Sequence, residues 1–361
     1  MRTVSRPTPD EIAAVLDQLA AGTDRMILQV GRSTLPVTNL DRVLWPDARP
    51  RFTKRDLLVY LARVSPYMLP HLEGRPAFVT RYPEGVTGES FYQKSWDAPP
   101  PFVRTLSIWS KDSAMARDYL LVSNLATLLW LGQQAAIEIH VWFSRISAKP
   151  DARRLPTDYA GGEEALAASR LNYPDFLVVD LDAYVYSGRE DAGGEPELHR
   201  RGFRRVRDIA FEVRRVAEAL SLEAFVKTSG RTGLHLYLPI FRRFTFDEVR
   251  AMAETIGHFV LSLRPREVTL AWSVRDRTGK VFFDYNQNVR GKSLAVAYSP
   301  RRHPAGTVSM PVSWDELPHV YPTDFTLATA PDLLAARGDQ WSAVLDAKGD
   351  LEAILAASGA P

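Results

Sequence analysis

The sequence predicts an α+β fold, and three observations lead to that expectation. Segments that read as strands follow one another through short turns about as often as helical segments separate them, which argues against a doubly wound parallel sheet. The chain has 361 residues, of which 45% are hydrophobic and 24% charged, values ordinary for a globular protein with a large core. No apolar run is long enough to span a membrane.

The composition narrows the class of protein further. Cysteine is absent, which excludes disulfides, thiolate zinc sites and a cysteine nucleophile. The formal net charge of +2 permits a nucleic-acid partner without requiring one. The first residues contain no apolar signal-peptide core, so we expect a cytoplasmic protein with no membrane partner.

Capping residues mark the expected helix starts. Thr8 precedes apolar residues spaced for one face of a helix, and Thr53 is followed three residues later by Asp56, as in a capping box. Thr245 stands before another such segment. The expected helices cover residues 8–22, 53–69, 119–134, 200–220 and 245–263.

Strands are expected where apolar and β-branched residues run for a few positions between turn residues. These segments are 76–82, 136–143, 176–186, 224–228, 234–240, 268–274, 280–284 and 293–298. Because many of them are joined by short connections, we expect mixed or antiparallel sheets flanked by helices.

Two acidic residues interrupt the apolar strand at 176–186. Side chains alternate across a strand, so Asp180 and Asp182 point to one face. Adjacent carboxylates repel unless a divalent cation lies between them, and oxygen ligands favour Mg²⁺ or Mn²⁺ over zinc. Asp284 ends another apolar strand and is a candidate third ligand for a two-metal site. A solvent-facing strand end, a DxD glycosyltransferase and a nuclease are the alternatives.

The segment 227–235, KTSGRTGLH, lies between two predicted strands. Its glycines allow a tight turn whose N–H groups can form an anion nest, and Ser229 and His235 add polar groups. It is not a Walker loop, because GK[ST] is missing and no helix follows. A plain hairpin turn is the alternative.

Further candidates lie in the first half of the chain. His140 sits in the strand at 136–143, where a structural role is the alternative to ligand binding. Phe91 and Tyr92 are adjacent aromatics beside Lys94, a combination suited to stacking on nucleic-acid bases. Core packing is their alternative role, although neighbouring residues of a strand face opposite sides.

In this order, the motifs resemble the polymerase domain of bacterial DNA ligase D, within the archaeo-eukaryotic primase superfamily. The resemblance rests on TNLDRVLWP (38–46), TKRDLLVYL (53–61), HLEGRP (71–76), GESFYQK (88–94), IEIHVW (137–142), VVDLD (178–182), KTSGRTGLH (227–235), KVFFDYNQN (280–288) and AYSPR (297–301). It implies a primase-like catalytic core at 31–361, helical from about 314, after an N-terminal helical extension at 1–30.

The resemblance also implies roles for single residues. Asp180, Asp182 and Asp284 would bind two Mn²⁺ or Mg²⁺ ions and carry the catalysis. The positions that would contact the incoming NTP or dNTP are His140, Ser229, Gly230, His235, Arg277 and Arg301. Phe91 and Tyr92 would stack on the base and template. Those expected at the DNA 5′-phosphate and backbone are Asn39, Arg42, Lys54, Arg81 and Lys94. Thr232 stands where relatives often have Lys.

The implied activity is a metal-dependent primase-polymerase. It would add nucleotides, with ribonucleotides preferred, to primer 3′ ends while filling gaps in non-homologous end joining. The expected partners are DNA with gaps, overhangs or 5′-phosphate ends, together with Ku and a separate ligase, in a nucleoid-associated cytoplasmic protein. A de novo primase and a non-catalytic DNA end-binding module are the alternatives.

Overall fold

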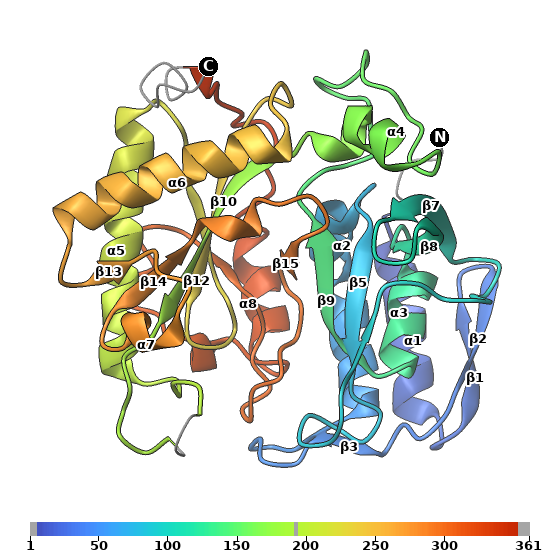
Figure 1. Cartoon of the computed structure of the whole chain (residues 1–361). Helices are drawn as coiled ribbons and strands as arrows, with labels where there is room; N and C mark the ends of the chain where they lie inside the picture. The colour runs from blue at the N-terminus through green and yellow to red at the C-terminus, as the bar shows by residue number, and fades with distance from the viewer. Residues whose placement is uncertain (1–5, 191–193, 353–361) are drawn as a thin grey trace.

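Two six-stranded sheets stand side by side in the computed structural model, which describes residues 6–190 and 194–352 (Figure 1). The first sheet has the order β15-β9-β5-β8-β7, and β6 pairs with β5. Its strands are β5 (Ala77–Arg81), β6 (Phe91–Gln93), β7 (Arg104–Ser110), β8 (Met115–Leu121), β9 (Ala136–Trp142) and β15 (Ser293–Ala295). All of its recorded pairings are antiparallel.

The second sheet has the order β13-β14-β10-β12-β11-β16. Its strands are β10 (Phe176–Ala183), β11 (Phe225–Thr228), β12 (Leu234–Pro239), β13 (Val268–Thr269), β14 (Val281–Asp284) and β16 (Pro311–Val312). Only β13 and β14 pair in parallel among these strands. The expected α+β class with mostly antiparallel sheets is therefore confirmed.

Two short hairpins precede the sheets. They are β1 (Met26–Val30) with β2 (Ser33–Val37), and β3 (Val43–Trp45) with β4 (Phe52–Thr53). The first hairpin spans residue 30, which was the expected boundary between an N-terminal extension and the main domain. Val15 and Leu19 of the preceding helix are buried in the same hydrophobic cluster as strands of both sheets.

Helices flank both sheets. They are α1 (Pro9–Ala21), α2 (Lys54–Leu72), α3 (Leu125–Gln133), α4 (Glu163–Ala168), α5 (Arg200–Ala219), α6 (Phe246–Leu263), α7 (Val274–Arg277) and α8 (Ala330–Arg337). In Figure 1, α5 and α6 lie along the second sheet, whereas α2 and α3 lie with the first. None of the described helices combines the length and hydropathy that crossing a membrane requires.

The local signals place several helix starts correctly. Thr8, Thr53 and Thr245 each form a capping box, in which the threonine hydroxyl accepts from the third N–H and an acidic side chain returns to the cap. The predicted basic helix at 200–220 is α5. The end of the chain, expected to be helical from about 314, contains α8 and a 3-10 turn, Pro322–Asp324, within its described part.

One predicted helix is wrong in its first part. Residues 119–121, expected to begin a helix running to 134, belong to β8, and α3 starts only after Asn124. The Asn124 side chain accepts from the Thr127 N–H at 2.8 Å. The apolar run is compatible with either structure, and pairing with β7 along the whole of β8 decides for the strand. The strand expected at 268–274 is likewise reduced to β13.

A buried carboxylate joins the two sheets. Asp175 precedes β10 and is fully buried, and basic side chains reach it from four separate segments. Their nitrogen–oxygen distances are 2.8 Å for Arg145, 2.9 Å for Lys348, 3.1 Å for Arg75 and 3.5 Å for Arg242. Although burial alone would raise it, these cations hold the pKa of Asp175 well below its usual range.

We predict that Asp175→Asn lowers the free energy of unfolding by about 3–5 kcal/mol at neutral pH, because it leaves buried cations without their counter-charge. The pKa of Asp175 is lower in the folded protein than its unfolded value near 3.8. Ionised Asp175 therefore stabilises the folded state above pH 3.8, and this stabilisation is lost as the pH falls further. The difference between the two proteins should therefore shrink below about pH 4. Denaturant titrations at several pH values test this, with the exposed Asp17→Asn as the control; equal stability at pH 7 would contradict it.

Candidate functional site

Four polar residues form a row across the second sheet. Asp284 on β14 lies opposite Asp180 on β10, Asp180 lies opposite His235 on β12, and His235 lies opposite Lys227 on β11. Directly opposed residues of antiparallel strands share a face of the sheet. Asp182, two residues after Asp180 in the same strand, points to that face as well. The sheet therefore collects three carboxylates, a histidine and a lysine on one side.

The carboxylates of Asp180 and Asp284 are buried, and both side chains are in contact with one amide. Gln287 Nε2 donates to Asp284 Oδ2 at 3.0 Å and lies 3.5 Å from Asp180 Oδ2. Asp284 Oδ1 accepts from the Asn286 N–H at 2.9 Å. Asp180 Oδ1 has no hydrogen-bond partner within the described residues. The described contacts leave acceptor capacity for a further ligand.

The pKa values of the three carboxyls are all raised. Burial, followed by the charges of Asp182 and Asp284, raises the pKa of Asp180 well above its usual range. Burial and Asp284 raise the pKa of Asp182 to about 6. Burial also raises the pKa of Asp284, against the opposing effect of its hydrogen bonds. Without a cation, this part of the protein resists full ionisation.

The donor set fits a hard divalent cation. The three oxygen-bearing side chains share one face, repel one another, and include a buried oxygen without a partner. Oxygen ligands of this kind suit Mg²⁺ or Mn²⁺. In the described part of the chain, no three acidic or histidine side chains are already arranged to hold a metal ion.

A cavity of about 190 Å³ opens beside the carboxylates, between the two sheets. The second sheet contributes Asp180, Asp182 and His235. His140 enters from β9 of the first sheet, and Arg301 follows β15. Ser229, from the loop after β11, completes the predicted residues that line it. Burial and Arg301 lower the pKa of His140 to about 4, so its ring is neutral at physiological pH.

The glycine-containing loop after β11 is braced by its own serine. Ser229 Oγ accepts from the N–H groups of Arg231 and Gly233, each at 3.1 Å, so those two groups do not form the free anion nest expected from the sequence. Gly230 has a φ of +73°, and a Cβ there would collide with the Arg301 side chain. Arg231 reaches out to Glu195 at 2.9 Å.

Arg301 is held at the cavity by a buried glutamate. Its Nε lies 3.2 Å from Glu138 Oε1, and Glu138 also accepts from the Tyr82 hydroxyl at 2.9 Å. Burial alone would raise the pKa of Glu138, but Arg301 and His140 lower it to about 2. The guanidinium is therefore oriented by an ionised partner on β9, two residues before His140.

Arg277 is among the predicted nucleotide contacts but does not line this cavity. Its guanidinium carbon lies 3.4 Å from the centroid of the Phe282 ring. It donates to the Tyr184 hydroxyl at 2.8 Å and to the carbonyl of Trp272 at 2.6 Å. Its charge lowers the pKa values of Asp182 and Asp284, which places it near the acidic site.

A groove of about 710 Å³ has Tyr92 and Lys94 among its lining residues. Trp109, Lys111, Arg290 and Lys292 also line it, so the groove combines aromatic and cationic side chains, with Asp112, Glu163 and Asp247 among its other lining residues. Phe91 and Tyr92 on β6 are 53% and 56% exposed. Gln287, which contacts Asp284, lines the same groove. The groove thus leads to the carboxylates.

The residues predicted to bind a 5′-phosphate lie in and around the β3–β4 hairpin. The Lys54 N–H donates to the Arg42 carbonyl at 2.9 Å, and the Arg42 N–H donates to the Asn39 carbonyl at 3.2 Å. Burial, and then the charges of Arg42 and Arg81, lower the pKa of Lys54. These cations are therefore close enough to repel one another, as expected of a site for an anion.

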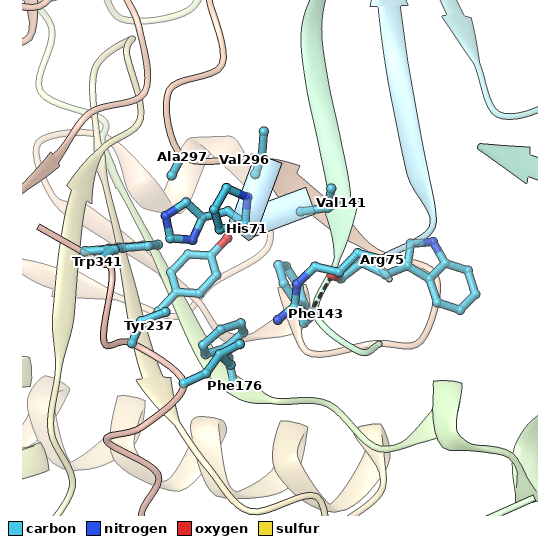
Figure 2. Close-up of a pocket in the computed structure, with 13 residues that line it drawn as sticks. His71, Arg75, Val141, Phe143, Phe176, Tyr237, Val296, Ala297 and Trp341 are labelled. Atoms are coloured by element: carbon cyan, nitrogen blue, oxygen red, sulfur yellow. Dashed lines mark hydrogen bonds between the residues drawn. The ribbon is translucent and has the colours of Figure 1, made fainter. Parts of the chain in front are cut away.

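A second, smaller cavity of about 30 Å³ lies farther along the same face of β12 (Figure 2). Tyr237, which follows His235 by two residues, points into it, and His71, Arg75 and Trp341 surround it. It contains none of the residues predicted from the sequence, and its lining is largely apolar.

Three residues of the site received no role from the sequence. Lys227 belongs to the motif KTSGRTGLH, and the signal that could have identified it is a lysine within an otherwise apolar strand. Glu138 and Gln287 also lie within motifs, IEIHVW and KVFFDYNQN, but their contacts with Arg301 and Asp284 depend on how the strands pack.

The chain is similar in sequence to proteins of known family. Residues 53–341 match the family described as LigD, primase-polymerase domain. The chain is 29% identical over 325 residues to the bifunctional non-homologous end joining protein LigD of Bacillus subtilis, covering 88% of this chain and 46% of that protein. It is 30% identical over 320 residues to the multifunctional non-homologous end joining protein LigD of Mycolicibacterium smegmatis, covering 88% and 36%.

A solved structure is also similar. The polymerase domain of Mycobacterium tuberculosis ligase D in complex with DNA has a TM-score of 0.71 and 27% identity, covering 87% of this chain and 99% of that one. The chain spans less than half the length of the two curated relatives named above.

We predict that Asp182→Asn stabilises the EDTA-treated protein by on the order of 1–3 kcal/mol at pH 7.5. A pKa of about 6 in the folded protein against 3.8 in the unfolded chain means that the folded state binds the proton more tightly. Stability is therefore lost as the pH rises from about 4 to 6, and the gain from the substitution should vanish near pH 4. Thermal unfolding beside Asp17→Asn measures this; destabilisation at pH 7.5 would contradict it.

Proposed function

This chain belongs to the LigD primase-polymerase domain family, a family of nucleotidyltransferases, and on that premise we propose that it extends primer 3′ ends at gaps in broken DNA. The proposal includes dependence on Mn²⁺ or Mg²⁺ and a preference for ribonucleotides. One observation carries it: two of three mutually repelling carboxylates line a cavity whose other polar residues include two histidines, Ser229 and Arg301.

Asp180, Asp182 and Asp284 are the residues that would hold two divalent ions. Ions bound there would activate the primer 3′-hydroxyl and neutralise charge on the transferring phosphate. Strand pairing sets Asp180 opposite Asp284, and the Gln287 amide contacts both carboxylates. A non-catalytic DNA end-binding module would not require carboxylates whose ionisation is costly in the absence of a cation.

The cavity between the sheets is the proposed site for the nucleotide triphosphate. Ser229, His235 and Arg301 offer donors to phosphate oxygens, and Arg301 does so with a charge. His140, neutral beside Arg301, offers a further polar group from the opposite sheet. Gly230 permits the close approach of Arg301 to the loop. Arg277 acts on this site through its charge.

The groove lined by Tyr92 and Lys94 is the proposed path of the DNA strand. Exposed aromatic faces can stack on bases of any sequence, and the lysines can contact the backbone. The similar mycobacterial polymerase domain was solved in complex with DNA. Asn39 and the cationic cluster of Arg42, Lys54 and Arg81 form the proposed site for the 5′-phosphate. It favours gap filling over de novo priming, since priming requires no such end. Ku and a separate ligase in the nucleoid remain the proposed partners.

We predict that Asp182→Ala abolishes primer extension and leaves DNA binding nearly unchanged. The substitution removes an oxygen ligand but leaves the groove and the cationic cluster intact. Extension of a gapped duplex with a recessed 5′-phosphate is measured with Mn²⁺ or Mg²⁺ and with NTPs or dNTPs, and binding is measured by fluorescence anisotropy. Asp17→Ala is the control. Extension at the native rate by the variant would refute the metal-site assignment.

We predict that Arg42→Ala reduces the stimulation of gap filling by a 5′-phosphate about tenfold, as expected for the loss of one charge-assisted hydrogen bond. Extension on a substrate with a 5′-hydroxyl should not change. The comparison uses both substrates and a matched control, Arg63→Ala, because the ion pair of Arg63 with Asp332 is about as exposed as that of Arg42 with Glu84. Equal losses on both substrates would place Arg42 in general DNA binding instead.

A further inference from the structure

We propose that Lys227 is a positioning residue that holds His235 in the tautomer with its proton on Nε2, directed at Asp180 and the cavity. The consequence for nucleotide binding rests on the proposed function, but the tautomer does not. Lys227 itself is not among the residues that line the cavity. It acts from behind His235, on the neighbouring strand.

The buried amine of Lys227 has two close polar contacts. The side chain is fully buried, and Nζ lies 2.6 Å from His235 Nδ1 and 2.5 Å from Ser309 Oγ. The ring of Tyr237 is 5.9 Å away. A buried amine is costly unless its N–H groups are used, so these two contacts must be hydrogen bonds that satisfy it.

The direction of the bond to Ser309 is determined by a third residue. Ser309 Oγ donates its single proton to the carbonyl of Thr228 at 2.8 Å. Toward Lys227 it can therefore act only as an acceptor. Lys227 is the donor in that bond, whichever charge state the amine has.

The bond to His235 Nδ1 then has two possible directions. If Lys227 donates, Nδ1 carries the lone pair and the ring proton is on Nε2. If a neutral Lys227 accepts, the proton is on Nδ1 and the bare Nε2 faces Asp180 Oδ1 at 3.4 Å. When Asp180 is ionised, the second arrangement brings two acceptors together at Asp180 Oδ1, an atom that has no other donor in the described part of the chain. The first arrangement turns the same contact into an attraction.

The tautomer matters because His235 Nε2 is on the side that lines the cavity. With a proton there, the ring is a donor toward Asp180 and toward an anionic phosphate. Without it, the ring offers only a lone pair to groups that are themselves acceptors. A positioning partner of this kind typically changes affinity or activity about ten- to hundredfold when it is lost.

The primary test needs no variant. In the protein labelled with ¹⁵N-histidine and held in Mg²⁺, which favours the ionised form of Asp180, long-range ¹H–¹⁵N correlation spectra report which ring nitrogen of each histidine carries the proton, and His235→Gln assigns the signal. We expect the proton of His235 on Nε2. A proton on Nδ1 in the native protein overturns the proposal, whether or not the protein extends primers.

The second test removes the lysine. Lys227→Met should shift the His235 nitrogen signals toward a mixture of tautomers, whereas Lys149→Met, which removes an exposed lysine that does not line the cavity, should leave them unchanged. With DNA saturating, Lys227→Met should raise the KM for the nucleotide about tenfold with a smaller change in kcat. In the His235→Gln background, whose amide has no tautomers, Lys227→Met should have no further effect on KM.

These outcomes separate the inference from the proposed function. Unchanged His235 signals in Lys227→Met, or an equal rise in KM when Lys227→Met is made in the His235→Gln background, overturn the positioning role. Absence of nucleotide incorporation by the native protein, with the expected tautomer and its shift, overturns the proposed function alone.

Discussion

The arrangement of the site depends on a buried ion cluster that lies away from it. Asp175 immediately precedes β10, and the cations that neutralise it come from the ends of β9 and β12, the start of β5 and the C-terminal segment. Each of these charges would be costly to bury alone, so the segments carrying them must meet at one point. The point where they meet sets β9 of the first sheet beside β10 of the second, and the cavity lies between those strands.

The site itself buries charges of one sign, whereas the Asp175 cluster pairs opposite charges. Its three carboxylates repel each other, and burial raises the pKa values of all three. Neighbouring groups limit the repulsion. His235 is neutral, because burial and Lys227 lower its pKa, and Gln287 donates a hydrogen bond to Asp284. The protein thus gives up stability at a place where a cation would restore it, which is common at functional sites.

The two sheets make different contributions. The second sheet provides the acidic row, because antiparallel pairing aligns residues of β14, β10, β12 and β11 at one level. The first sheet provides His140, the glutamate that orients Arg301, and the aromatic groove. Neither sheet alone forms the walls of the cavity, because His140 comes from the first sheet and Asp180, Asp182 and His235 come from the second.

By itself, the sequence determined features that depend on neighbours along the chain. The caps at Thr8, Thr53 and Thr245 are local hydrogen bonds, and the shared face of Asp180 and Asp182 follows from the alternation of a strand. The order of motifs was sufficient to identify the family. The run at 119–134 was misjudged because its apolar residues suit a strand or a helix, and pairing with β7 decided between them.

Only the tertiary structure decided which distant residues meet. Asp284 faces Asp180, Glu138 binds Arg301, and Lys227 reaches both His235 and Ser309 because of strand register and sheet packing. Those contacts join segments far apart in the chain, and no local pattern specifies them. The physical reason is that burial makes the energy of a charge depend on every partner around it, whereas a cap or an alternating strand depends on a few adjacent residues.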